Sequence, residues 1–393
     1  MPADEFNENA DPSESEGAMT QAEAKKLYAE ARQYAYPPAR KLEHYTLRYI
    51  TDPDAPGAMA AMEKMYKLYA KVFPIEEERE SMDSLVSLLR ANKGRDGSDG
   101  KVPCREQWVL VENDKGEVVA ANNSMVFSAV NNPEVSRYVG GTTHLNYTFV
   151  DPAYRGQGHA EIATGYSYDK AREFIASTYK DGRKAESVPM LEVAEQNAAL
   201  KMTPEEILVD TAGAQTDQSK RRDIFQGWGF GQLDLPSPYV QLPLEPRAEG
   251  GASATGMDLV CRGVPAPKSF LIIASEPAEI PSEVIKFHLH EFMDQGVAKG
   301  KYDIETDPDW IMQAKALDAV PTVKVLDNLD HLGMKDALWA KLDEIVHAKK
   351  FDADAFSNKT MGEIMGVEKI GPKRAMTTAP ATKPPRFEYA IAG

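Results

Sequence analysis

Two glycines stand where a strand-like pattern gives way to a helical one, in the stretch VDPAYRGQGHAEIATG, residues 150–165. Gly156 and Gly158 place no side chain at the point where backbone N–H groups fan out ahead of the helix. Such a turn can hold an anion, because the free N–H groups and the positive end of the helix dipole both favour negative charge. Arg155 adds a cation beside the pair.

Three anion-binding motifs compete for this glycine pair. A dinucleotide-binding fingerprint requires a third glycine where Glu161 stands. A phosphate loop of the NTPase type requires Gly-Lys-Ser/Thr after a longer spacing, and no such run occurs in the chain. The third interpretation, a pyrophosphate seat for coenzyme A, fits the whole segment. A tight strand-to-helix turn that binds nothing is the structural alternative.

The segment resembles the GCN5-related N-acetyltransferase (GNAT) superfamily. The resemblance is carried by Asp151, Pro152, Tyr154, Arg155, Gly156, Gln157, Gly158 and Ala160, followed by a long helical pattern. The family loop is a six-residue Gln/Arg-x-x-Gly-x-Gly/Ala run, from which this chain departs at the first position, Ala153. LEVAEQNAAL, residues 191–200, is similar to the family's fifth strand with the Asn after it, and Gly229-Phe230 to the pair ahead of the last strands. The similarity covers residues 44–244, about half of the chain.

The resemblance implies an N-acyltransferase, and more narrowly an N-acetyltransferase, with acetyl-CoA or another acyl-CoA as co-substrate. An amine acceptor, either a small molecule or a protein amine, attacks the thioester directly in a ternary complex. In the family the fourth and fifth strands part and expose an amide that polarises the thioester carbonyl, here near residues 149–151. The implied coenzyme A contacts are Phe149, Val150, Asp151, Arg155, Gly156, Gln157, Gly158, His159, Ala160 and Asn197.

The acceptor ammonium must lose a proton, which calls for a base that titrates near neutrality. Family bases often lie on the fourth strand about ten residues before the loop, which corresponds to Thr143 and His144. Of these two, His144 has the suitable side chain. Glu192 and Glu195, on or just after the fifth strand, are the alternative catalytic candidates.

One departure from the family leaves a second hypothesis open. Many members protonate the leaving thiolate with a Tyr four residues before the Gly of Gly-Phe, and this chain has Phe225 there. A phenyl ring donates no proton. The chain is therefore either an enzyme that uses another proton donor or a non-catalytic CoA-binding or scaffold protein that retains the fold. An insertion at 201–220 carries Asp210, Asp217 and Gln218, which are candidates for holding a cationic acceptor.

Composition excludes several classes of protein. The chain has 393 residues, two cysteines, a net charge of −16 and no apolar run of membrane-spanning length. We expect a cytoplasmic protein without a nucleic-acid or membrane partner. His288 and His290 beside Glu291 are compatible with a metal site only if they share a face, and helical residues two apart do not. We therefore expect structural histidines and no metal.

The predicted fold is α/β, with a mixed, mostly antiparallel central sheet flanked by helices and an appended, mostly helical C-terminal domain. Strands are predicted over 44–51, 108–112, 118–127, 142–150, 188–194, 239–244 and 270–274, and helices over 21–34, 59–73, 76–91, 158–179, 219–228, 281–297, 308–319 and 335–350. The predicted parts are a disordered acidic N-terminus (1–20), a helix and linker (21–39), the acyltransferase domain (40–245), a linker (246–256), the C-terminal domain (257–350) and an extended basic tail (351–393).

Overall fold

The computed structural model describes residues 45–74, 79–98, 100–197, 224–225, 227–237, 239–242, 248, 257–263, 278–297 and 303–326. Several predicted features lie outside the described residues: the N-terminal parts 1–39, the insertion 201–220, the strand over 270–274, the helix over 335–350 and the tail 351–393. The same holds for the linker 246–256 apart from residue 248, and the helix over 219–228 is described only in part.

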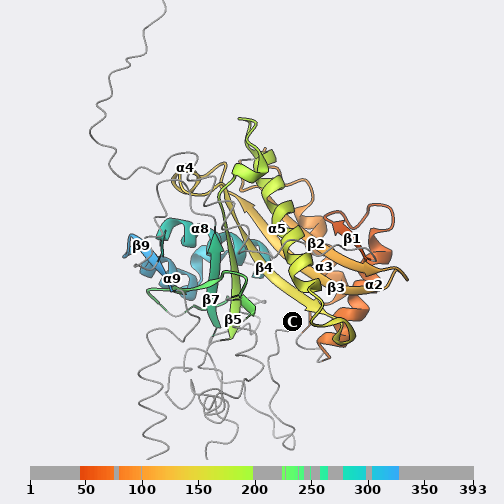
Figure 1. Ribbon diagram of the computed structural model, residues 1–393. Coiled ribbons are helices and arrows are strands. Elements are labelled where there is room, and N and C mark those ends of the chain that lie inside the picture. The colour runs from red at the N-terminus through yellow and green to blue at the C-terminus, as the bar shows by residue number, and fades with distance from the viewer. Residues whose placement is uncertain are drawn as a thin grey trace, which may run out of the picture.

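Within the described residues, the strands form one sheet in the order β1-β2-β3-β4-β5-β7-β6-β9-β8 (Figure 1). They are β1 (Tyr45–Ile50), β2 (Cys104–Asn113), β3 (Val118–Ser128), β4 (Gly141–Val150), β5 (Met190–Asn197), β6 (Gly231–Asp234), β7 (Met257–Gly263), β8 (Ala278–Pro281) and β9 (Thr322–Leu326). The β4–β5 pair is parallel, and the other pairs are antiparallel. The predicted mixed, mostly antiparallel sheet is confirmed.

Helices cover both faces of this sheet. They are α2 (Ala58–Val72), α3 (Met82–Asn92), α4 (Pro133–Ser136), α5 (His159–Thr178), α8 (Ser282–Glu291) and α9 (Pro308–Asp318), with short turns η3 (Pro152–Tyr154), η4 (Ala185–Ser187), η8 (Ile304–Thr306) and the π-helical η7 (Phe292–Val297). No helix in the described ranges has both the length and the apolar character that crossing a membrane requires.

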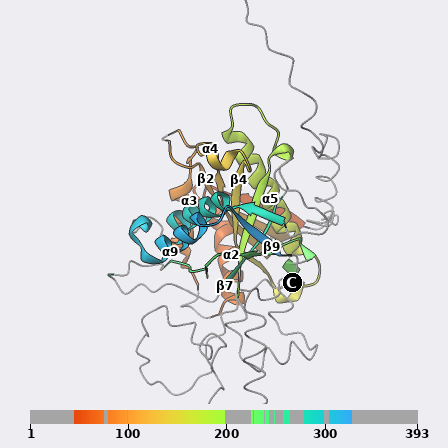
Figure 2. The same ribbon diagram turned by 90° about the vertical axis from the view of Figure 1, so that its left-hand side faces the viewer.

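Strand alternation assigns each helix to a face, because successive side chains of a strand point to opposite sides. On β2, Trp108 and Leu110 share a core with α2 and α3, whereas Val109 and Val111 share one with α5. Figures 1 and 2 show the same division, with α5 across one face and α3 on the other.

The C-terminal part adds strands to the same sheet. β7 pairs with β5 along residues 191–197, and β9 joins β8 to β6. The described C-terminal residues therefore share a sheet with the predicted acyltransferase domain. The domain boundaries themselves stay a prediction.

The strand predicted over 239–244 is wrong for the residues described there, since residues 239–242 hold only an isolated bridge at Gln241. The Gln313 side chain on α9 takes both backbone groups of Val240, accepting from its N–H at 3.0 Å and donating to its carbonyl at 2.8 Å. These bonds satisfy the groups that a strand partner would otherwise satisfy. The strand that borders β5 instead is β7.

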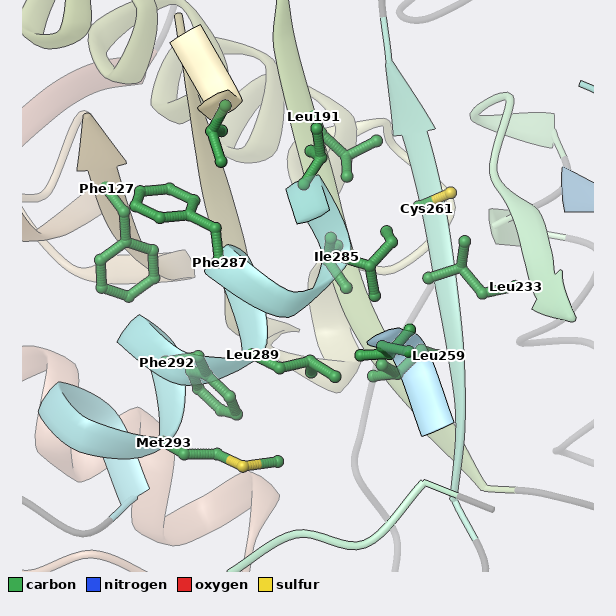
Figure 3. Packing of buried hydrophobic residues seen from close by; sticks show 14 of the residues in the cluster. Phe127, Leu191, Leu233, Leu259, Cys261, Ile285, Phe287, Leu289, Phe292 and Met293 are labelled. Atoms are coloured by element: carbon green, nitrogen blue, oxygen red, sulfur yellow. The ribbon is translucent and has the colours of Figure 1, made fainter. Parts of the chain in front are cut away.

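Helix α8 packs on the face of the sheet opposite α5. Its Ile285, Phe287 and Leu289 share one buried cluster with Phe127 of β3 and Leu259 of β7 (Figure 3). Val126, the neighbour of Phe127, belongs to a cluster with α5 on the other face. Helix α8 thus packs against β3, which lies beside β4, and against β7, which lies beside β5.

Replacing Gly141 by Ala tests the close packing at the start of β4. A Cβ there would lie 2.3 Å from the Phe127 carbonyl oxygen and 2.8 Å from Cδ1 of Ile175. We expect the free energy of unfolding to fall by roughly 1–3 kcal/mol, as for other overpacked sites, measured by urea denaturation. The control is Gly227→Ala, where a Cβ meets nothing within 4 Å. Equal urea midpoints for the two variants would contradict the close approach.

Candidate functional site

The loop between β4 and α5 has the backbone that its glycines predict. Gly156 and Gly158 have φ of 72° and 82°, in the left-handed region that glycine adopts without strain. Gly158 is the N-cap of α5 and no side chain caps the helix there. Ile162 N–H donates to the Gly158 carbonyl at 3.1 Å, so the N–H groups of residues 159–161 precede the helical bonding pattern. A Cβ on Gly156 would meet nothing within 4 Å, which leaves room for a ligand beside the backbone.

Two contacts fix this loop to the rest of the protein. Asp151 accepts a hydrogen bond from Ala153 N–H at 3.0 Å and pairs with Lys71 of α2 at 2.7 Å. The Tyr154 hydroxyl accepts from Asn113 Nδ2 at 3.1 Å. The loop therefore has a defined position next to the end of β4, with Lys71 at its edge as a further cation.

The predicted coenzyme A contacts differ in whether their side chains are exposed or buried. Arg155 and Gln157 are exposed on the loop, whereas Phe149 and Val150 are buried in opposite cores. His159 is 3% exposed and its ring lies 4.4 Å from the Tyr45 ring, and burial lowers its pKa. Phe149, Val150 and the buried Ala160 have no polar side-chain atom and can therefore offer only backbone groups to a ligand. The side chain of Asn197 lies outside the described residues.

Strands β4 and β5 part after a short ladder. Their last pair is Leu145 with Ala194. Beyond it β5 continues with β7 to Asn197, and β4 continues with β3 to Val150. The ladder thus ends on the N-terminal side of residues 149–151, near which the exposed amide is predicted. The backbone groups of residues 146–150 that face β5 are therefore not part of the β4–β5 ladder.

A bulge marks the residue at which the strands part. On β3, Ser124 pairs with Leu145 and Asn123 pairs with Tyr147, so Asn146 is an extra residue on β4. Bulges bend a strand and redirect its side chains, and they are frequent beside active sites. The bulge therefore bends β4 at the point where it leaves β5.

His144 precedes the parting by one paired residue and is 1% exposed. Its Nδ1 lies 3.1 Å from Nε2 of His288 on α8, and the Phe292 ring stacks on it with centroids 3.6 Å apart. His288 Nδ1 in turn lies 2.9 Å from Oγ1 of Thr142. Burial lowers the pKa of His144 well below its usual value and that of His288 to about 3, so both rings are neutral at pH 7.

The two glutamate candidates have different surroundings. Glu192 is 2% exposed and forms an ion pair with Arg262 of β7, whose Nε, at 2.6 Å, and Nη2 both donate to Oε2. Burial raises the pKa of the Glu192 carboxyl, and the guanidinium, which stays protonated, offsets that penalty. Glu195 is half-buried, follows the last β4–β5 pair and accepts a hydrogen bond from the Tyr239 hydroxyl. The structure thus places Glu195 at the parting and Glu192 inside a β5–β7 pair.

The sequence did not predict a polar network on the α2 and α3 face. Asn146 Nδ2 donates to Asn123 Oδ1 at 2.8 Å, and Asn123 donates to the Glu106 carboxylate. Glu106 is 2% exposed and Asn123 is 1% exposed. A usable signal existed, because Asn-Asn-Ser interrupts the otherwise apolar strand VVAANNSMVF, residues 118–127. The network links β2 to the bulge through buried hydrogen bonds.

Phe225 is fully buried in the α5 core, with its ring perpendicular to that of Phe230 at 4.9 Å. It packs as a core residue, and its ring offers no proton to the site.

Comparison with known proteins gives no match to any family model and none to a curated protein. Solved structures similar to this chain include the ribosomal-protein-S18-alanine N-acetyltransferase from Escherichia coli (10% identity, 58% of this chain, 99% of that chain, TM-score 0.29). A second is an acetyltransferase of the GNAT family from Staphylococcus aureus Mu50 (13% identity, 56% of this chain, 99% of that chain, TM-score 0.28). A third is an aminoglycoside 6'-N-acetyltransferase complexed with coenzyme A (12% identity, 57% of this chain, 99% of that chain, TM-score 0.31). At these values any inference about this chain depends on its own strand order and loop.

Glu192→Gln is expected to act on stability. It removes one charge of a buried pair, and leaving Arg262 uncompensated should lower the free energy of unfolding by about 3–5 kcal/mol, measured in urea at pH 7. The matched control is Glu173→Gln in the exposed pair with Lys170, where we expect less than about 1 kcal/mol. Similar small losses in both variants would show that the buried pair has no such role.

The two buried histidines predict acid sensitivity. Their folded pKa values lie below the unfolded value near 6.5, so the unfolded state binds more protons and stability is lost as pH falls below about 6.5. Each histidine should cost about 1.4 kcal/mol at pH 5.5 relative to pH 8. His288→Gln should remove one such contribution from the difference in unfolding free energy between those two pH values. An unchanged difference would show that His288 is protonated in the folded state.

Proposed function

We propose that this chain is an acyl-CoA-dependent N-acyltransferase of the GNAT superfamily, and an acetyltransferase in the narrower form. The observation that carries the proposal is one continuous arrangement. The strand that parts from its parallel neighbour after Leu145 runs directly into the left-handed loop of Gly156 and Gly158 at the start of α5. This arrangement supports a seat for a pyrophosphate and, next to it, an opening for a thioester.

The loop would bind the pyrophosphate through backbone N–H groups of residues 156–160, assisted by the α5 dipole. The exposed Arg155 supplies a charged donor for a phosphate oxygen. Lys71, held beside the loop by Asp151, adds positive potential at its edge. These groups fit an anionic ligand although the whole chain carries a net charge of −16.

The thioester would lie where β4 and β5 separate. A backbone N–H on the β5-facing edge of residues 146–150 would donate to the thioester oxygen as negative charge develops on it. The amine nitrogen attacks the carbonyl carbon, the C–S bond breaks, and coenzyme A leaves as a thiolate that takes up a proton. The acceptor loses one proton in the same reaction.

For that proton, His144 is proposed as the base and Glu195 as the second candidate. His144 is neutral and therefore has a lone pair to offer, and Glu195 lies at the parting itself. Glu192 is the weaker candidate because Arg262 occupies its carboxylate. The acceptor class, a small-molecule amine or a protein amine, stays open, and a cytoplasmic location stays a prediction.

The second candidate function is a CoA-binding protein without turnover. The observation in its favour is the buried Phe225, which stands where the family resemblance implies a proton-donating Tyr. Acetyl-CoA turnover against a panel of amines separates the two functions. Tight binding with no thiol release above the hydrolysis background would favour the non-catalytic protein, and amine-dependent release would exclude it.

Gly156→Val should abolish coenzyme A binding, because a branched side chain would fill the space beside the loop backbone. Isothermal titration should detect acetyl-CoA binding to the wild type and none at millimolar ligand to the variant. Gly182→Val is a matched control, since Gly182 has φ of 70° against 72° for Gly156 and a Cβ meets nothing within 4 Å at either site. Both variants carry the same backbone strain, so equal loss of binding in both would refute the assigned seat.

A further inference from the structure

Helix α8 and the adjoining η7 each contribute one side chain that contacts His144 from outside its own strand. His288 contacts His144 through Nε2, and Phe292, the first residue of η7, stacks on its ring at an interplanar angle of 8°. His288 and Thr142 lie 2.9 Å apart, so a chain of hydrogen bonds runs from Thr142 through His288 to His144. The contact of His144 with His288 joins residues 144 positions apart in the sequence.

A neutral imidazole has one N–H donor and one lone-pair acceptor. When Nε2 of His288 accepts from Nδ1 of His144, Nδ1 of His288 carries the proton and donates to the Thr142 hydroxyl oxygen. His144 then has its lone pair on Nε2. The opposite direction would place a proton on Nε2 of His144 and remove its capacity as a base.

We propose that His288 is a positioning residue for acyl transfer, which fixes the ring and tautomer of His144 so that Nε2 can accept the acceptor's proton. The inference rests on the proposed function and adds to it a residue of the C-terminal segment. Thr142 is the group that orients His288, as a third group orients the base in other catalytic arrangements.

The packing around α8 gives this arrangement its rigidity. Ile285 and Leu289 of α8 are buried in the core with Phe127 of β3 and Leu259 of β7 (Figure 3). Glu283 near the start of the helix pairs with Arg137 at 2.9 Å. Because these contacts fix α8 against the sheet, the ring nitrogens of His288 and His144 stay within hydrogen-bonding distance.

The surroundings of His144 are otherwise apolar. Met125 on β3 and Val193 on β5 are its paired neighbours, η7 places Phe292 on the ring, and α8 places His288 there. Among the described residues, His288 is the titratable group that faces it. Replacing His288 should therefore directly change which nitrogen of the His144 ring carries the proton.

Nitrogen-15 NMR of the histidine-labelled full chain reads the tautomer without requiring activity. We expect His144, assigned by its loss in His144→Gln, to carry its proton on Nδ1 and none on Nε2. In His288→Leu the two tautomers should mix. A proton on Nε2 in the wild type, or an unchanged tautomer in His288→Leu, would overturn the inference.

Kinetics supply the second measurement. His288→Leu should lower kcat by roughly ten-fold or more with an unchanged KM for acetyl-CoA, as expected when a base is misoriented. His288→Gln, whose amide can reach the position of Nε2, should retain most of the activity. Phe287→Leu is the matched control, because it removes a buried ring from the same helix and core without touching the hydrogen-bonded chain.

The outcomes separate the two proposals. Wild-type turnover with equal kcat in His288→Leu and Phe287→Leu would overturn the positioning role and leave the acyltransferase standing. Absence of amine-dependent turnover in the wild type would overturn both. A loss of kcat in His288→Leu together with near-normal kcat in His288→Gln supports the role. A purely structural contact would not make these two variants differ.

Discussion

The short parallel ladder between β4 and β5 is the constraint on which the candidate site depends. After Leu145 and Ala194, β4 keeps its pairing with β3 through a bulge, and β5 keeps its pairing with β7. Beyond that pair, the facing backbone edges of β4 and β5 do not bond to each other and require other polar partners. Because the glycine loop continues directly from β4, one strand carries both the separation and the proposed anion seat.

Polar groups on either side of the parting are bonded outward, each toward its own half of the sheet. Asn146 bonds to Asn123 of β3, which bonds to Glu106 of β2. On the other side Glu192 of β5 pairs with Arg262 of β7. Buried charges and amides are costly unless they are satisfied in a defined geometry. The Asn146 network thus ties the β4 bulge to β3 and β2, whereas Glu192, which pairs with Thr143 inside the ladder, ties β5 to β7.

Local signals explain what the sequence predicted. Alternation predicted β1, the NDKG turn helped to predict β2 and β3, and an apolar run predicted β5. The glycine pair with its helix predicted the loop and α5. The stretch MDLVCRG of β7 was missed because it follows a Gly- and Ala-rich segment and shows little alternation. The strand over 239–244 was predicted from its apolar pattern, but Gln313 on a distant helix satisfies the Val240 backbone. The contact of His144 with His288 and the pair of Glu192 with Arg262 likewise join distant positions, which no local pattern encodes.

The surroundings of His144 combine two opposing effects on its use as a base. Burial disfavours the imidazolium and lowers its pKa, which weakens the base against an ammonium acceptor. The chain through His288 to Thr142 acts in the other direction, because an imidazolium at His144 would donate from Nδ1 to a neutral acceptor that is itself hydrogen-bonded. Hydrogen bonds strengthen one another in such a chain when the surroundings have a low dielectric constant. On the proposed function, a segment far along the chain from the glycine loop thus offsets part of the loss of basicity that burial causes.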